Sequence, residues 1–208
     1  MTESPNPQVP MSWHPSGKLL AFVETDPRTR ADVWILPTDG DEATGWKPGK
    51  PAPFLNSPYN EHFPAFSPDG RWLAYSSDEA GRFEVYVRPF PGPGGKWQVS
   101  TGGGSRPTWS RNGKELLYRV PGPGGQTLMV APYNVEGDSF SPEKPRQWSP
   151  GLVLGVTPLT RPFDLHPDGQ RVAVLKATDA VEERRDHVVL IQDFFEELRR
   201  LAPARRTR

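Results

Sequence analysis

Short runs of apolar residues, separated by turn-forming residues, recur along the whole chain. Four of them come directly after a turn that contains glycine, at residues 19–23, 72–75, 115–118 and 172–175. A second run follows each of these, at residues 33–36, 83–87, 128–131 and 188–191. Weaker further runs stand at residues 53–55, 97–99 and 151–154. Such short apolar runs, bounded by turn signals, are typical of strands covered on both faces, so the pattern predicts an all-β fold.

The turn before each first run repeats one phrase, an apolar residue followed by a short turn with glycine in the fifth position. The copies start at residues 13, 66, 109 and 165, so they are 53, 43 and 56 residues apart. In such a turn Asp or Asn accepts hydrogen bonds from the backbone, and Gly adopts the positive φ that a tight hairpin needs. We therefore expect structural turn roles for Gly17, Asp69, Gly70, Asn112, Gly113, Asp168 and Gly169.

A repeat of this period with three or four strands per unit is typical of a β-propeller blade. We expect about four blades in a single domain over residues 11–201, with units near 11–58, 59–104, 105–158 and 159–201. Residues 1–10 and 202–208 are expected to be flexible tails. Apolar residues spaced i, i+4 and i+7 within 194–201 predict a short C-terminal helix. Two Pro-Gly segments, 91–95 and 121–125, are expected at corresponding places in successive units.

Composition and charge narrow the possible functions. The 25 basic residues balance the 25 acidic ones, so no general attraction to nucleic acid or membrane is expected. Without cysteine the chain has no disulfide and no thiolate metal site. The polar, proline-rich start lacks the apolar stretch of a signal peptide. The chain as written is therefore expected in the cytoplasm, or in the periplasm if it is a fragment of an exported or membrane-anchored protein.

No catalytic motif is present in the sequence. We find no Gly-x-Ser-x-Gly elbow, no phosphate-binding Gly-x-x-x-x-Gly-Lys and no His-Glu-x-x-His, so we expect no enzyme, no cofactor and no metal site. The candidate ligand-binding residues are His62, Arg106 and Arg161, which precede the predicted innermost strands of their units. Together they would form a basic rim at one mouth of a central channel and favour an anionic ligand or an acidic segment of a partner. The alternative is that they are ordinary solvated surface residues.

Two stretches resemble known propeller repeats. Residues 66–77, Phe-Ser-Pro-Asp-Gly-Arg-Trp-Leu-Ala-Tyr-Ser-Ser, resemble the repeat of TolB-like propellers, also described as WD-repeat-like. Residues 84–97 resemble the propeller region found C-terminal to bacterial serine/threonine kinases. The resemblance covers roughly residues 11–201. It implies a propeller of usually six or more blades that acts as a non-catalytic interaction or sensor module.

Several alternatives stay open at this point. Four units could be part of a larger propeller, an unusual four-bladed ring, or one half of a self-associated pair, because an open ring leaves strand edges unprotected. We expect a protein partner or a small anionic ligand. The alternative functions are a hydrolase or lyase with its active site in the propeller channel, and a regulatory fragment of a serine/threonine kinase.

Overall fold

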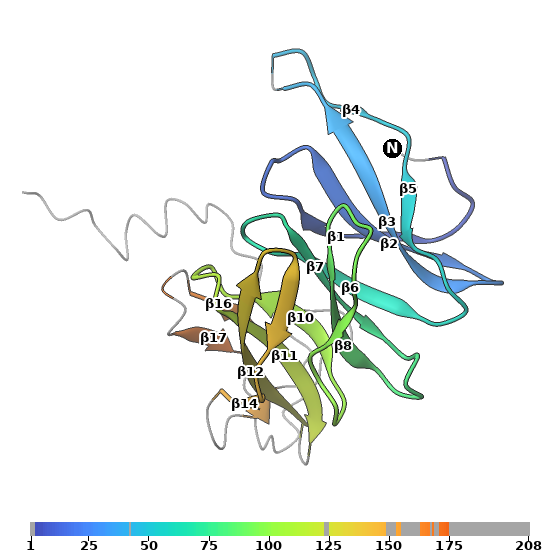
Figure 1. The fold of residues 1–208 in the computed structure, drawn as a ribbon. Coiled ribbons are helices and arrows are strands. Elements are labelled where there is room, and N and C mark those ends of the chain that lie inside the picture. The colour runs from blue at the N-terminus through green and yellow to red at the C-terminus, as the bar shows by residue number, and fades with distance from the viewer. Residues whose placement is uncertain are drawn as a thin grey trace, which may run out of the picture. The chain divides into compact units, whose positions relative to one another are not determined.

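The computed structural model describes residues 3–41, 43–122, 125–148, 153–154, 163–166, 168 and 171–174. The chain divides into two compact units, residues 1–177 and 178–208, and all described residues belong to the first. The predicted helix at 194–201 lies outside the described residues. Within the described part every element is a strand, and the strands form four successive sheets that run from blue to orange in Figure 1.

Each sheet is built from neighbouring strands that pair in an antiparallel way. The first sheet contains β1 (Gln8–Trp13), β2 (Leu19–Asp26), β3 (Arg30–Asp39), β4 (Lys47–Pro48) and β5 (Ala52–Leu55). The second contains β6 (Glu61–Phe66), β7 (Trp72–Ser77), β8 (Glu84–Pro89) and β9 (Trp97–Gln98). The third contains β10 (Ser105–Trp109), β11 (Glu115–Gly122), β12 (Gly125–Glu136), β13 (Ser139–Pro142), β14 (Arg146–Gln147) and β15 (Val153–Leu154). The fourth pairs β16 (Phe163–Leu165) with β17 (Val172–Val174).

The repeated phrase forms the hairpin between the first two strands of each sheet. The backbone N–H that opens the turn donates to the carbonyl that closes it in all four sheets, at 2.8–2.9 Å: His14 to Leu19, Ser67 to Trp72, Ser110 to Glu115 and His166 to Arg171. The turn glycines Gly17, Gly70 and Gly113 have φ values of 71°, 73° and 66°. Gly169 lies outside the described residues.

The polar turn residues bond to the backbone that follows them. The side-chain oxygens of Asp69, Asn112 and Asp168 accept hydrogen bonds from the backbone N–H groups of Arg71, Lys114 and Arg171, respectively. Short side-chain acceptors of this kind hold the turn before the second strand begins.

The core lies between the sheets. Strand β7 is buried on both faces: Leu73 and Tyr75 pack toward the first sheet against Val33, while Trp72 packs toward the third sheet against Leu116. A third cluster joins the third and fourth sheets through Leu117, Leu128, Val130, Phe163 and Leu165. Successive antiparallel sheets that stack face to face through continuously apolar strands are propeller blades. The all-β propeller class predicted from the repeat is therefore confirmed.

Two local expectations differ from the structure. Strand β1 begins at Gln8 and pairs with β2 from Gln8 to Pro10, so residues 8–10 belong to the first blade and not to a flexible tail. The segments 91–95 and 121–125 do not occupy corresponding places. Residues 91–95 connect β8 to β9, whereas Gly122 pairs with Gly125 in the hairpin between β11 and β12.

Candidate functional site

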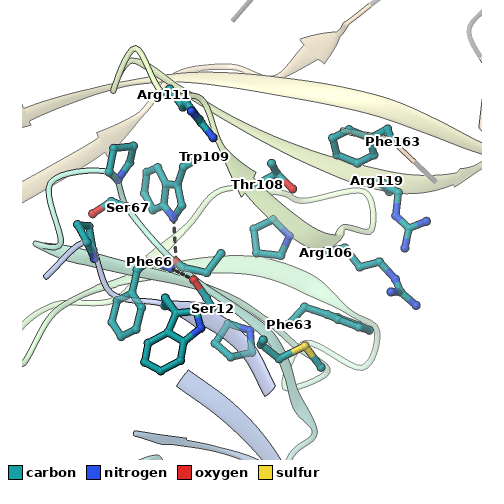
Figure 2. Close-up of a pocket in the computed structure, with 17 residues that line it drawn as sticks. Ser12, Phe63, Phe66, Ser67, Arg106, Thr108, Trp109, Arg111, Arg119 and Phe163 are labelled. Carbon is teal, nitrogen blue, oxygen red and sulfur yellow. Dashed lines mark hydrogen bonds between the residues drawn. The ribbon is translucent and has the colours of Figure 1, made fainter. Parts of the chain in front are cut away.

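The first strands of successive blades lie side by side. Strand β6 contacts both β1 and β10. The backbone N–H of Phe66 donates to the Oγ of Ser12 at 3.1 Å, and the indole Nε1–H of Trp109 donates to the carbonyl oxygen of Ala65 at 2.8 Å (Figure 2). These bonds connect the inner edges of three blades directly, so they fix the spacing of the side chains that face inward.

A cavity of about 820 Å³ lies along these inner strands (Figure 2). Its volume is within the range of about 300–1,000 Å³ that ligand sites occupy. The lining comes from β1, β6, β10 and the turns that follow them, with one residue each from β11 and β16: Met11, Ser12, Trp13, Pro15, Phe63, Pro64, Ala65, Phe66, Ser67, Pro68, Arg106, Pro107, Thr108, Trp109, Arg111, Arg119 and Phe163.

The charged residues of this lining are Arg106, Arg111 and Arg119; no acidic residue is among the described residues that line the cavity. Figure 2 shows Arg106 and Arg119 at one end, and Arg111 beside Trp109 at the other. Burial lowers the pKa of Arg106 below its usual value, but a guanidinium keeps its charge at any physiological pH. The cavity therefore presents positive charge at both ends.

Aromatic rings add apolar surface to the same cavity. The guanidinium carbon of Arg106 lies 4.2 Å from the ring centroid of Phe63, which is cation–π geometry. Trp13 keeps 55% of its surface exposed although it is a large apolar side chain. Tryptophan and arginine, which both line this cavity, are enriched among the residues that contribute most to binding.

A backbone irregularity at the same place in two blades positions Phe63 and Arg106. Both residues have a φ of 56°, and the pairing register shifts between His62 and Ala65 in β6 and between Ser105 and Thr108 in β10. A bulge of this kind redirects a side chain, and its cost is tolerated where the direction matters. Phe63 and Arg106 are therefore equivalent positions of the repeat.

The three predicted rim residues have different locations. Arg106 lines the cavity, whereas His62 is not among its lining residues and packs against the rings of Phe63 and Phe83, with centroids 5.4 and 5.8 Å away. Burial lowers the pKa of His62; the charge of Asp78 opposes this shift, and that of Arg106 adds to it. His62 is therefore neutral near pH 7 and adds no charge to the site. Arg161 lies outside the described residues.

Three lining residues were not among those predicted from the sequence: Arg111, Arg119 and Trp13. A signal for Arg111 was present, because it occupies the turn position where the first two copies of the phrase carry Pro15 and Pro68, and all three residues line the cavity. No comparable signal distinguished Arg119, which lies in the middle of β11 and is 1% exposed.

The described residues contain no cluster of three or more His, Cys, Asp or Glu side chains arranged to hold a metal ion. In the same part of the chain, no helix has the length and apolar character needed to cross a membrane.

The stacked antiparallel blades define the chain as a β-propeller protein. Comparisons with known proteins give partial similarities. No family model matches the chain. It is similar to the TolB structure from Agrobacterium tumefaciens, with 17% identity and a TM-score of 0.48, over 68% of this chain and 51% of that one. It is also similar to TolB from Acinetobacter baumannii, with 17% identity and a TM-score of 0.43, over 82% of this chain and 49% of that one.

A stretch of 113 residues is 35% identical to Tricorn protease homolog 1 from Streptomyces coelicolor. This match covers 52% of the chain but 9% of that protein, and the chain spans about half of each TolB chain. The resemblance to kinase-associated propellers stays a prediction.

Proposed function

We propose that this chain is a non-catalytic binding module and that its inner-strand cavity holds an acidic, extended segment of a protein partner. The observation that carries the proposal is the lining itself, which combines three arginines with exposed aromatic surface and has no carboxylate among its described residues. Arginine binds carboxylates in a bidentate way, and aromatic side chains with arginine are the residues most enriched where binding energy is concentrated.

The location of the cavity supports a segment over a compact ligand. The lining runs along three adjacent inner strands, and arginine side chains lie at both ends of the cavity (Figure 2). An extended chain with acidic side chains a few residues apart would meet Arg111 at one end and Arg106 at the other, and its apolar side chains would contact aromatic residues of the lining.

The chemistry of the lining supports binding over catalysis. General acid–base catalysis needs a group whose pKa is near the working pH. The described lining residues include no Asp, Glu, His, Cys, Lys or Tyr, the residue types that usually act as general acids and bases. The similarity to Tricorn protease homolog 1 extends over 9% of that protein, so its name does not bring a protease activity to this chain.

The test is calorimetric titration of the full chain with a hexaglutamate peptide at low salt. The double variant Arg106→Ala/Arg111→Ala is expected to weaken binding by at least about tenfold, because two charge-assisted contacts are lost. The matched control is Lys47→Ala/Lys144→Ala, which also removes two positive charges, both from exposed residues outside the lining. Equal affinity of the two double variants would mean that net charge alone attracts the peptide, and the cavity assignment would be wrong.

A further inference from the structure

A second, smaller pocket lies away from the inner strands, between the first and second blades. It has a volume of about 320 Å³. Its lining comes from the end of β5, the connection to β6, the first residue of β6, and strands β7 and β8 with their loops: Phe54, Leu55, Asn56, Ser57, Tyr59, Glu61, Tyr75, Glu79, Arg88 and Lys96. None of these residues lines the inner-strand cavity. The volume is near the lower limit of about 300 Å³ for ligand sites, so an occupant would be small.

Glu61 brings a buried acceptor to this pocket that the protein does not satisfy. The residue is 4% exposed, and one carboxylate oxygen accepts a hydrogen bond from the Oγ of Ser57. The other oxygen, Oε2, is buried and has no hydrogen-bond partner among the described residues. A buried carboxylate oxygen without a donor is costly, and such a group is a reason to look for a ligand that supplies one.

Arg88 brings an unusual positive charge to the same pocket. It pairs with Leu73 across β7 and β8, and the equivalent pairs in the other blades are Leu20 with Leu36 and Leu116 with Ala131. The apolar residues at the equivalent positions show that the fold does not require a charge there. The guanidinium of Arg88 is half-buried and forms no hydrogen bond or ion pair with the part of the chain that the structure describes.

The remaining charges of the pocket neutralise each other. The Nζ of Lys96 donates to both carboxylate oxygens of Glu79, at 2.5 and 2.7 Å. Lys96 also lies 5.1 Å from the ring centroid of Tyr86. Glu61 and Arg88 are therefore the two lining charges left for an occupant, and the rings of Phe54, Tyr59 and Tyr75 supply apolar surface beside them.

We propose that this pocket binds a small zwitterion that carries both an ammonium and a carboxylate group, such as a free α-amino acid. The ammonium donates to Oε2 of Glu61, and the carboxylate accepts from the guanidinium of Arg88. A simple amine would leave Arg88 without a counter-charge, and a simple carboxylate would leave Glu61 without a donor, so only a molecule with both groups satisfies the pocket. This site is separate from the cavity of the proposed function, and neither depends on the other.

The charge state of Glu61 makes the binding depend on pH. Burial raises the pKa of Glu61 to about 7, although the hydrogen bond from Ser57 opposes the shift; the negative charges of Asp32, Asp78 and Glu79 add to it. Of the other groups near the carboxyl, Tyr75 is neutral because burial raises its pKa, and Arg88 and Lys96 are the basic side chains of the pocket. An ammonium bound at Oε2 favours the ionised carboxylate, so affinity should fall as the pH is lowered below 7.

The test screens the full chain with the twenty common L-amino acids by thermal shift and then measures the best ligand by calorimetry. The methyl ester of that amino acid keeps only the ammonium, and its N-acetyl derivative keeps only the carboxylate. We expect each derivative to bind at least about tenfold more weakly than the parent amino acid, since each lacks one charge-assisted contact. No shift with any of the twenty, or a derivative that binds as tightly as the parent, would overturn the proposal.

Two variants locate the site. Glu61→Gln and Arg88→Met are each expected to weaken binding of that amino acid by at least about tenfold. The matched controls are Glu136→Gln and Arg146→Met, which change exposed residues of the third sheet. If Glu61→Gln does not fold, the affinity of Arg88→Met for that amino acid is the test of the proposal. Binding of the folded variants at the affinity of the unchanged chain would also overturn the proposal.

Discussion

Replacing Glu61 by Gln should stabilise the chain at alkaline pH and leave its stability unchanged at acid pH. Glu61 is 4% exposed, and its pKa is raised to about 7 from an ordinary value of 4.5. The folded state therefore holds the proton more tightly than the unfolded state does. The stability contributed by the neutral carboxyl is fully present below pH 4.5 and is lost as the pH rises through 7.

The expected loss of unfolding free energy follows from the size of the pKa shift of Glu61, from 4.5 to about 7. Each pKa unit corresponds to about 1.4 kcal/mol, so ionising Glu61 lowers the free energy of unfolding by roughly 3 kcal/mol between pH 4.5 and pH 8. Because the side chain is almost fully buried, solvent screening reduces this little. Glutamine has nearly the same shape and cannot ionise. In a chain of this size, 3 kcal/mol corresponds to a difference in melting temperature of roughly 6–12 °C.

The assay is urea denaturation of the ligand-free chain and of Glu61→Gln at pH 4.5, 6, 7 and 8.5, followed by tryptophan fluorescence. The quantity to compare is the difference in unfolding free energy between the two proteins at each pH, which removes the contribution of every other titrating group. Glu136→Gln, at an exposed position, should show a difference near zero throughout. A Glu61→Gln difference that does not change with pH would refute the reasoning, because it would mean that Glu61 titrates normally.

Two further predictions concern the turns and the buried polar contacts. A Cβ at Gly70 would lie 2.3 Å from the Nε2 of His14, whereas a Cβ at Gly113 would meet nothing within 4 Å, and both glycines have positive φ. Gly113→Ala should therefore lower the free energy of unfolding, measured by urea denaturation, by about 1 kcal/mol, and Gly70→Ala should lower it clearly more. The additional loss at Gly70 should disappear when His14 is also replaced by Ala. Equal losses for the two single variants would contradict the predicted clash with His14. The Oγ of Ser100 is buried, accepts the N–H of Val85 at 2.8 Å and donates to a buried carboxylate, so Ser100→Ala should cost about 2–3 kcal/mol. A loss within about 0.5 kcal/mol, as at a surface site, would mean that water replaces the hydroxyl.

The fold could be predicted because the repeat and the burial pattern express the same physical constraint. A strand covered on both faces is mainly apolar, and β7 is such a strand: every residue is buried, and residues 72–75 are apolar. The hairpin phrase could be assigned to a turn because only a few residue types satisfy that geometry. Strand ends were less predictable. Gln8–Pro10 pairs with β2 in spite of its proline, because β1 is an edge strand of its sheet and its free edge needs no hydrogen-bond donor.

Similar composition did not guarantee a similar location. The two Pro-Gly segments share their residue types, but β11 extends for 8 residues where β7 extends for 6, so the second segment becomes the hairpin of a longer pair of strands. Sequence shows that such a segment interrupts a strand. It does not show which pair of strands the segment connects, because this depends on where the pairing ends.

The candidate site was harder to predict because its position depends on a bulge. From the sequence, His62 and Arg106 were expected at equivalent positions, but the positive φ values make Phe63 the equivalent of Arg106. A shift of one residue in a strand moves a side chain to the opposite face, so this difference decides which residue reaches the cavity. The backbone of the bulge is not encoded in residue type: one blade has Phe at this position and another has Arg.

Departures from the repeat are nevertheless a usable signal, and they point to both proposed sites. Arg111 stands where Pro15 and Pro68 stand in other copies of the turn. Glu61 lies four residues after Ser57, at the place where Gly104 follows Ser100, and a Cβ at Gly104 would lie 2.3 Å from the Oγ of Ser100. A side chain at Gly104 would therefore displace the Ser100 hydroxyl, whereas Glu61 fits beside Ser57 and accepts a hydrogen bond from it. Residues that the fold requires recur in every blade, so the requirements of the fold do not explain Glu61, a buried charged residue that breaks the repeat.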